Sequence, residues 1–354
     1  MKPTTTPARA TALALLATAL LTCLLAPGLA EAQVYTNKNE TVGGFIEFGI
    51  HKYDPFTGAL QSGFNAQSGL GSGILSLSGN TLYVLGLSGS AVGTYNATTG
   101  ATQNSFFATA PAGWSGGQDT MSVSGSNLFL GGNVAAGPTI SDVVAKYDAT
   151  TGALTNASFI TLPTSGFSPP QLAATGNSLF VTTSGTVGSY NATTGAPING
   201  SLVTGLSTNT STVSTFIADL TVAGSSLFVA TQTYNIVGST STAAGFKIGK
   251  YDATTGLATN ASLITLGGTT TISDTALLGN RLYVDYFDGT NQQLAVYDAT
   301  TGASITPSLI AAPGNAIAIG PVPEPGSGTL ALLGSLAFLA RRRRRQGHGC
   351  NAGA

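Results

Sequence analysis

Three aspartates in this sequence have a spacing that could build a cation site. Asp119, Asp219 and Asp274 each lie five or six residues before a glycine that introduces an apolar triplet, and Gln171 takes the matching place in another copy. If these residues open the innermost strands of a repeated fold, they meet around a central channel. Carboxylate oxygens suit Ca²⁺, so the pattern predicts a calcium site of a metal-dependent hydrolase or lactonase. Solvated acids at strand starts explain the same spacing and are the preferred interpretation.

Other catalytic chemistry has few residues to use. His51 is the only histidine between residues 33 and 320, and both cysteines, Cys23 and Cys350, lie in the end segments. A single histidine has no evident partner to orient it as a base. HExxH, zinc-ligand and P-loop patterns do not occur. We therefore expect no nucleophilic, zinc or nucleotide mechanism, and a binding or structural role more readily than an enzyme.

The charge balance bears on the partners of the protein. Of the 14 acidic residues, only Glu31 and Glu324 lie outside residues 33–322, which leaves 12 acids there against six bases. A mildly acidic body has no basic surface for a phosphate backbone. Nucleic acid is therefore a poor candidate partner.

A repeated hexad marks the elements that would position these side chains. Its order is tyrosine, aspartate or asparagine, two variable residues, threonine and glycine. It begins at Tyr53, Tyr95, Tyr147, Tyr190, Tyr251 and Tyr297. The intervals of 42 to 61 residues are in or near the range of propeller blades. The Asx side chain can cap a tight turn and the glycine can take a positive φ angle. Turn capping is the preferred interpretation over a ring of cation-binding aspartates.

A second signature keeps step with the hexads. Glycines introduce the triplets Leu82-Tyr83-Val84, Leu128-Phe129-Leu130, Leu179-Phe180-Val181, Leu227-Phe228-Val229 and Leu282-Tyr283-Val284. Such aromatic and β-branched runs are typical of strands. Each repeat thus predicts four strands, which is the composition of a propeller blade in an all-β protein.

The ends of the repeat region determine the number of blades. Gln33-Val34-Tyr35 can stand where other repeats have Leu-Tyr-Val, and residues 315–319 supply one further strand after the last hexad. Pairing of these N-terminal and C-terminal strands would close a six-bladed ring without free edges. Seven blades is the second choice and a parallel β-helix the third.

Two intervals are longer than the others and predict enlarged loops. They contain the Gly-rich segments 110–117 and 131–137, and the segments 206–215 and 238–245. Loops of repeat proteins often form a binding face, so Trp114 is a candidate ligand platform. Packing of Trp114 over a blade is the preferred interpretation.

Residues 1–32 predict a helical secretory signal peptide. Lys2 and Arg9 give a positive start, residues 10–26 are almost wholly apolar, and Ala30-Glu31-Ala32 supplies small residues for cleavage. We expect secretion machinery to engage this segment and the mature chain to begin at Gln33. Residues 33–320 then form the propeller domain.

The C-terminal segment has three parts in order. These are the triplet Pro323, Glu324 and Pro325, an apolar run over 329–340, and a basic stop formed by Arg341, Arg342, Arg343, Arg344 and Arg345. Arginines beside an apolar run favour the cytoplasmic side of a membrane, although the run is short for a full span. Residues 321–345 resemble the PEP-CTERM sorting signal of exported bacterial proteins, followed by a short tail at 346–354. The resemblance implies processing at the triplet by an exosortase-type membrane enzyme.

The hexads also resemble the blade turns of quinoprotein-type propellers. Those blades carry a tryptophan a few positions after the glycine, whereas this chain has Phe106, Phe159, Leu263 and Leu309. The resemblance therefore implies blade geometry, and a quinone-dependent enzyme is the least favoured function.

Together these features predict an exported, surface-sorted structural or binding module of the cell envelope or extracellular matrix. A short apolar C-terminal helix would anchor it transiently in the membrane. An extracellular polysaccharide or another surface protein is the expected binding partner. The calcium-dependent hydrolase or lactonase is the alternative.

Overall fold

The structure is a computed structural model that describes residues 31–42, 45–64, 66–67, 73–86, 91–114, 120–136, 139–162, 169–311 and 313–322. All the regular elements in these ranges are β-strands, arranged in six sheets. Residues Ala32–Gly320 form one compact unit. The predicted signal peptide and C-terminal apolar helix lie outside the described ranges.

The first three sheets, blades 1 to 3, have four strands each, named in order from the channel outward. Blade 1 contains β25 (Ile317–Val322), β1 (Glu31–Val42), β2 (Phe45–Tyr53) and β3 (Ala66–Gln67). Blade 2 contains β4 (Ile74–Ser78), β5 (Thr81–Leu85), β6 (Ala91–Asn96) and β7 (Thr102–Thr109). Blade 3 contains β8 (Thr120–Ser124), β9 (Asn127–Ala136), β10 (Thr139–Asp148) and β11 (Leu154–Leu162).

Blades 4 to 6 follow the same order, except that blade 5 has an additional short strand, β16, beside its innermost strand β17. Blade 4 contains β12 (Leu172–Thr175), β13 (Ser178–Thr183), β14 (Thr186–Asn191) and β15 (Pro197–Val203). Blade 5 contains β16 (Thr208–Asn209), β17 (Val213–Ala223), β18 (Ser226–Val237), β19 (Thr240–Asp252) and β20 (Ala258–Gly267). Blade 6 contains β21 (Thr271–Leu278), β22 (Arg281–Phe287), β23 (Gln292–Asp298) and β24 (Ser304–Ala311). The long β17, β18 and β19 and the added β16 account for one of the longer hexad intervals.

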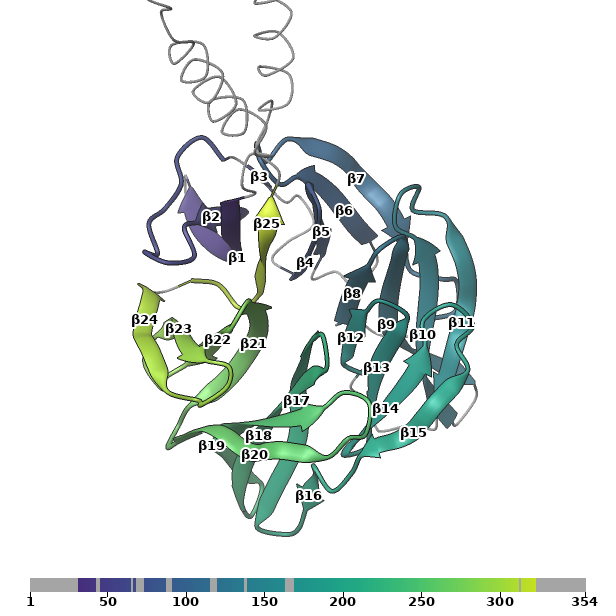
Figure 1. The fold of residues 1–354 in the computed structure, drawn as a ribbon, viewed down its shortest axis with the longest axis vertical. Coiled ribbons are helices and arrows are strands. Elements are labelled where there is room, and N and C mark those ends of the chain that lie inside the picture. Colours follow the sequence, from purple (N-terminus) through teal and green to yellow (C-terminus); the bar gives the residue numbers. More distant parts are fainter. Residues whose placement is uncertain are drawn as a thin grey trace, which may run out of the picture. The chain divides into compact units, whose positions relative to one another are not determined.

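The six sheets form a closed β-propeller, as predicted (Figure 1). The C-terminal strand β25 lies beside β1 in blade 1, so strands from both ends of the chain share one sheet. The register of β1 differs by one residue from the prediction. Val34 pairs with Tyr53 as Leu82 pairs with Tyr95, so Val34, and not Gln33, occupies the first position of the triplet. Asn37 therefore lies at the position that Leu85 occupies in blade 2.

The hexad forms the turn between the third and fourth strands of a blade. In blade 3, Asp148 Oδ1 accepts the backbone N–H groups of Thr150 at 2.9 Å and Thr151 at 2.8 Å, and the Thr151 hydroxyl at 3.0 Å. Asn96 makes the same three contacts in blade 2. These bonds to the ionised form hold the pKa of Asp148 below its usual value. The Asx side chain thus serves its own turn, whether or not it carries a charge.

Gly152 closes the blade 3 turn and also touches the neighbouring blade. Its φ angle of 74° lies in the left-handed region that favours glycine. A Cβ atom at this position would lie 1.8 Å from the carbonyl oxygen of Phe107 in blade 2. The hexad glycine is therefore required both by the turn and by the packing of adjacent blades.

Polar side chains connect one blade to the hexad of the next. Tyr83 of blade 2 donates its hydroxyl to the carbonyl of Ala149 in blade 3 at 2.7 Å, and Tyr35 and Tyr283 make equivalent bonds. Where a blade has phenylalanine in place of this tyrosine, a lysine can make the contact: Lys146 Nζ lies 2.8 Å from the Ala192 carbonyl. These contacts supplement apolar clusters that lie between neighbouring blades. We call the tyrosine and lysine bonds to these carbonyl groups the hexad-carbonyl bonds.

The apolar residue that follows each hexad packs at the same blade interface. In blade 2 this residue is Phe107, one position after Phe106, which was named as standing at the tryptophan position of quinoprotein-type blades. Phe107 contacts Tyr83 edge-on with ring centroids 5.8 Å apart, whereas Phe106 is 68% exposed. Phe107 lies seven residues after Gly100, which is also the spacing of Phe159, Leu263 and Leu309 from their hexad glycines. The spacing from the hexad therefore identifies the interface residue in each of these blades.

Candidate functional site

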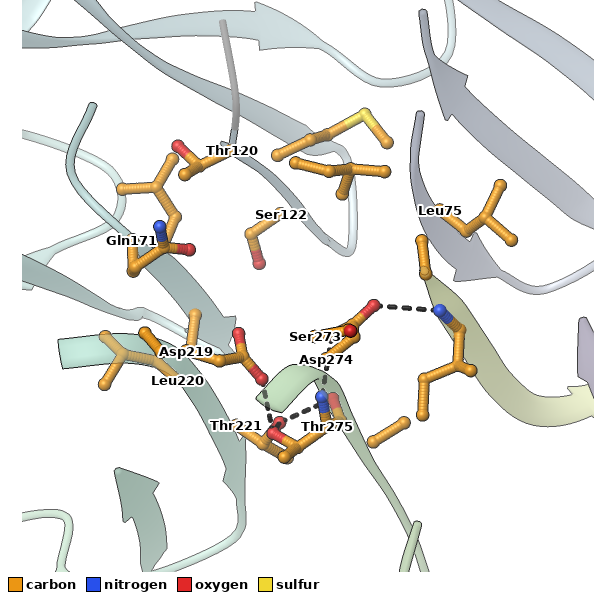
Figure 2. A pocket seen from close by; sticks show the side chains of 18 of the residues that line it. Leu75, Thr120, Ser122, Gln171, Asp219, Leu220, Thr221, Ser273, Asp274 and Thr275 are labelled. Atoms are coloured by element: carbon orange, nitrogen blue, oxygen red, sulfur yellow. Dashed lines mark hydrogen bonds between the residues drawn. The ribbon is translucent and has the colours of Figure 1, made fainter. Parts of the chain in front are cut away.

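A cavity of about 330 Å³ lies where the innermost strands of all six blades meet. Residues of β4, β8, β12, β17, β21 and β25 line it. Figure 2 shows Asp219 and Asp274 together with Thr221 and Thr275 on one part of the wall, and Ser122 on another. The structure thus brings two of the three predicted aspartates to one cavity.

Asp219 is placed by β17 and interacts with blade 6. Its Oδ2 accepts the hydroxyl of Thr275 at 2.5 Å. The side chain keeps some contact with solvent in the cavity, but the surrounding protein disfavours its charged form. This desolvation raises the pKa of Asp219 to about 6.

Asp274 connects β21 to the closing strand. Its Oδ1 accepts the backbone N–H of Thr275 and its Oδ2 accepts that of Ile317, both at 2.8 Å. Desolvation, followed by the negative charge of Asp219, holds the pKa of Asp274 well above its usual value. Two such carboxylates do not both ionise easily. Burial and mutual repulsion therefore favour protonation of Asp274 or a bound cation beside the pair.

Hydroxyl groups on the cavity wall join neighbouring blades. The Thr221 hydroxyl lies 2.8 Å from the carbonyl oxygen of Thr275 and 2.6 Å from its hydroxyl, which links β17 to β21. Ser122 Oγ accepts the N–H of Ala174, which links β8 to β12. These side chains are engaged in holding the ring, so the wall is preorganised and polar.

Asp285 is a buried acid directly beside Asp274, and it was not predicted from the sequence. It lies on β22 directly opposite Asp274, with none of its surface exposed. Gln292 donates Nε2 to its Oδ1 at 2.5 Å, and its Oδ2 is buried without a hydrogen-bond partner. Desolvation raises the pKa of Asp285 to about 8. The available signal was an aspartate directly after the strand triplet that ends at Val284.

The predicted calcium site is incomplete in the part of the chain that the structure describes. Asp119 lies outside the described residues, and Gln171 lines the cavity at the matching place in blade 4. Among the residues that are described, no three acidic, histidine or cysteine side chains are arranged to hold a metal ion. Calcium binding by Asp119, Asp219 and Asp274 stays a prediction.

The other two residues singled out for chemistry have packing contacts. Trp114 is half-buried and its ring covers Gly132 of β9, where a Cβ atom would lie 2.2 Å from the indole. His51 lies on β2 with its ring stacked on Tyr53, the centroids 6.1 Å apart. Trp114 thus has one face occupied by blade 3, and its role as a ligand platform stays a prediction.

Residues 321–345 match the family model of the PEP-CTERM protein-sorting motif. The chain carries a PEP-CTERM sorting signal. The match begins at Pro321, which also belongs to β25. Pro323, Glu324, Pro325 and the five arginines lie outside the described residues. Within the described ranges, no helix is long and apolar enough to cross a membrane.

Solved structures resemble this PEP-CTERM protein in fold. TolB from Acinetobacter baumannii has a TM-score of 0.53 and 14% identity, over 87% of this chain and 71% of that one. A chain of a nidogen/laminin complex has a TM-score of 0.51 and 9% identity, over 81% and 98%. At such low identity the likeness shows the fold alone. The search of curated proteins found no match.

The sorting signal and the propeller together support an exported protein that is sorted to the surface. The PEP-CTERM motif implies processing by an exosortase. The motif indicates export and processing, and says nothing of what the propeller binds or does.

Proposed function

We propose that the propeller is a non-catalytic structural or binding module of the cell envelope or extracellular matrix, with the channel cavity as its ligand site. The observation that carries this proposal is that the side chains of the cavity wall form hydrogen bonds between neighbouring blades. Thr221, Thr275 and Ser122 hold neighbouring blades together, so they form a rigid polar surface and not a reactive centre. A preorganised concave surface is the usual form of a binding site.

An extracellular polysaccharide is the ligand class that we favour over another surface protein. Its hydroxyl groups both donate and accept hydrogen bonds, as do the threonine and serine hydroxyls and the glutamine amide of the wall. The cavity of about 330 Å³ is at the small end of ligand pockets, which suits one or two sugar units and not a protein surface.

Binding to polysaccharide from the producing bacterium tests the proposal directly. Replacing Gln171 by Trp should fill part of the cavity and weaken co-sedimentation of the protein with the polysaccharide at least tenfold. Gln103→Trp, on the exposed strand β7, is the matched control and should bind as the unmodified protein does. Equal binding by both variants would show that the channel is not the site.

A metal-dependent hydrolase or lactonase is the second candidate. The meeting of Asp219 and Asp274 in the cavity favours it, because oxygen ligands and a need for positive charge suit Ca²⁺. Metal analysis of the purified protein, with thermal melts before and after a chelator, separates the two functions. A stoichiometric divalent ion, lost in Asp274→Asn but kept in Asp148→Asn, would favour the hydrolase. No metal and no change in melting temperature would exclude it.

A further inference from the structure

The enlarged blade 5 forms a groove together with the end of blade 4. Two segments that the sequence predicts as enlarged loops, 206–215 and 238–245, both contribute residues to it. Its volume of about 610 Å³ is roughly twice that of the channel cavity, and the two share no lining residue. Six threonines line the groove, namely Thr204, Thr208, Thr215, Thr231, Thr233 and Thr265. We call it the threonine groove.

Strand pairing brings five of these threonines and one lysine to the same face of blade 5. Thr231, Lys247 and Thr265 lie directly opposite one another on β18, β19 and β20. Two residues along the strands, a second row crosses all five strands and contains Thr208, Thr215, Thr233, Gly245 and Gly267. Residues two apart on a strand point to the same face, so both rows face the groove. The two glycines leave space beside the lysine side chain.

Hydrogen bonds hold both walls of the threonine groove in place. On blade 5, the hydroxyl groups of Thr215 and Thr233 lie 3.1 Å apart. On the blade 4 side, the backbone N–H of Leu206 donates to the carbonyl of Gly185 at 3.0 Å. A threonine hydroxyl has one donor and two acceptor sites, so the paired hydroxyls keep capacity for a ligand. The groove is therefore a preformed surface that offers hydroxyl groups.

Lys247 gives the groove a positive charge. The other bases whose side chains the structure describes have structural contacts: Lys146 and Lys250 form hexad-carbonyl bonds, and Lys52 and Arg281 lie over aromatic rings. Lys247 is exposed, and no acidic side chain among the described residues lines the groove beside it. A single cation surrounded by hydroxyl groups suits a ligand that carries both hydroxyl groups and a negative charge.

We propose that the threonine groove binds a carboxylated sugar of an extracellular polysaccharide, with Lys247 on the carboxylate and the threonines on the sugar hydroxyls. The volume of the groove lies within the usual range of ligand pockets. Residues 33–322 contain 12 acids against six bases, so an acidic polymer is repelled by most of the surface and is directed to this groove. The inference takes its ligand class from the proposed function and adds a second site to the channel.

Titration calorimetry of the exported protein with uronic-acid trimers tests the charge of the groove. The probes are the trimers of galacturonate, glucuronate and mannuronate, each with its methyl ester, which lacks the charge. At least one acidic trimer should bind roughly tenfold or more tightly than its ester, because a bond between ions is stronger than one between neutral groups. Lys247→Gln should remove this preference and leave binding of the ester unchanged. Equal binding of acid and ester, or no binding of any acidic trimer at millimolar concentration, overturns the proposal.

Two glycine substitutions test the location of the site. A Cβ atom at Gly267 would meet nothing within 4 Å, so Gly267→Trp should fill the groove without disturbing the fold, and should abolish binding of the acidic trimer. Gly200→Trp, at an equally open position on the outer strand β15, is the matched control and should bind as the unmodified protein does. Equal binding by the two variants would place the ligand elsewhere and overturn the proposal.

Gln171→Trp separates this inference from the proposed channel site. This substitution fills part of the channel and should leave binding of the acidic trimer unchanged, since the channel and the groove share no lining residue. Loss of binding in Gln171→Trp, without loss in Gly267→Trp, would assign the acidic sugar to the channel. That result would support the proposed function and overturn the groove as its second site.

Discussion

Replacing Asp285 by asparagine should make the propeller more stable at neutral pH and remove much of its pH dependence. The carboxyl group has no exposed surface, and only one of its oxygens has a hydrogen-bond partner. Asparagine keeps an acceptor for Gln292 and places an amide where the unpartnered oxygen lies. The substitution thus removes the cost of burying a charge or capturing a proton, with little change in shape.

The size of the effect follows from the two pKa values of Asp285. Its pKa is about 8 in the folded protein and 3.8 as a free side chain. The folded state therefore binds a proton more tightly than the unfolded state does. The contribution is most favourable below pH 4 and is lost as pH rises toward 8. At pH 7 the loss from this one group is at most about 4 kcal/mol.

Urea unfolding at pH 5, 6, 7 and 8 measures this dependence. The free energy of unfolding of the unmodified protein should fall by about 3 kcal/mol between pH 5 and pH 8, near the limit of about 1.4 kcal/mol per pH unit for one group. The Asp219 pKa of about 6 and the raised pKa of Asp274 act in the same direction. Some slope should therefore remain in Asp285→Asn, mostly below pH 6 for the part due to Asp219.

Asp148→Asn is the matched control, because Asp148 has a lowered pKa in an exposed turn and does not titrate between pH 6 and pH 8. Its slope in this range should equal that of the unmodified protein. If Asp285→Asn also keeps the full slope, Asp285 is not the group that takes up the proton, and the assignment of its raised pKa to burial is refuted.

Three further outcomes are expected from the blade interfaces and turns. Phe180→Tyr should add a hexad-carbonyl bond to Ala253, because among the described residues this blade junction has neither the tyrosine nor the lysine donor. The free energy of unfolding should rise by about 1 kcal/mol. No gain in a urea melt would mean that the Ala253 carbonyl is out of reach. Gly152→Ala should lower the free energy of unfolding by about 3 kcal/mol or more in a urea melt, because of the positive φ angle and the close contact with Phe107. Asp252→Asn should change stability by less than about 0.5 kcal/mol, since Asn96 and Asn191 cap the same turn elsewhere in the ring; a larger loss in a urea melt would show that the charge itself matters.

The number of blades and their strands could be predicted because the turn chemistry is local. An Asx side chain that caps the N–H groups two and three residues later needs no distant partner, so the hexad has the same form in every blade. The strand triplets follow at fixed positions because two-sided burial demands apolar residues on both faces. Closure by β25 followed from counting strands.

Register could not be predicted with the same certainty, because it depends on pairing between segments far apart in the sequence. Val34 occupies the first triplet position, which had been assigned to Gln33, only once β1 is paired with β2. The position named for blade 2, Phe106, was one residue short, since Phe107 packs at the interface and Phe106 is exposed. A shift of one residue exchanges the faces of a strand, so small errors in register assign the wrong side chains to the core.

The sequence could place the channel aspartates on the innermost strands, but it could not predict their hydrogen-bond partners. The spacing of Asp219 and Asp274 from the strand glycines places them at the starts of inner strands, where the cavity lies. That they share hydrogen bonds with Thr275, and that Asp274 holds the closing strand, depends on contacts between blades. Local patterns cannot supply such contacts, because each blade interface joins different repeats.

The positions where the repeats disagree carry the individual features of this ring. Two residues after the aromatic of each triplet, the six blades have Asn37, Leu85, Gly131, Thr182, Ala230 and Asp285, all of them buried. A position so well buried normally selects for apolar packing, and a polar side chain there must have a partner or a cost. Asn37 finds its partners in the segment before β25, whereas Asp285 lies opposite Asp274, which holds the same segment. Thr182 of blade 4 is the third polar side chain at this position, and its hydroxyl accepts the backbone N–H of Gln171. Two of the three polar side chains therefore belong to blades 1 and 6, which adjoin where the ring closes.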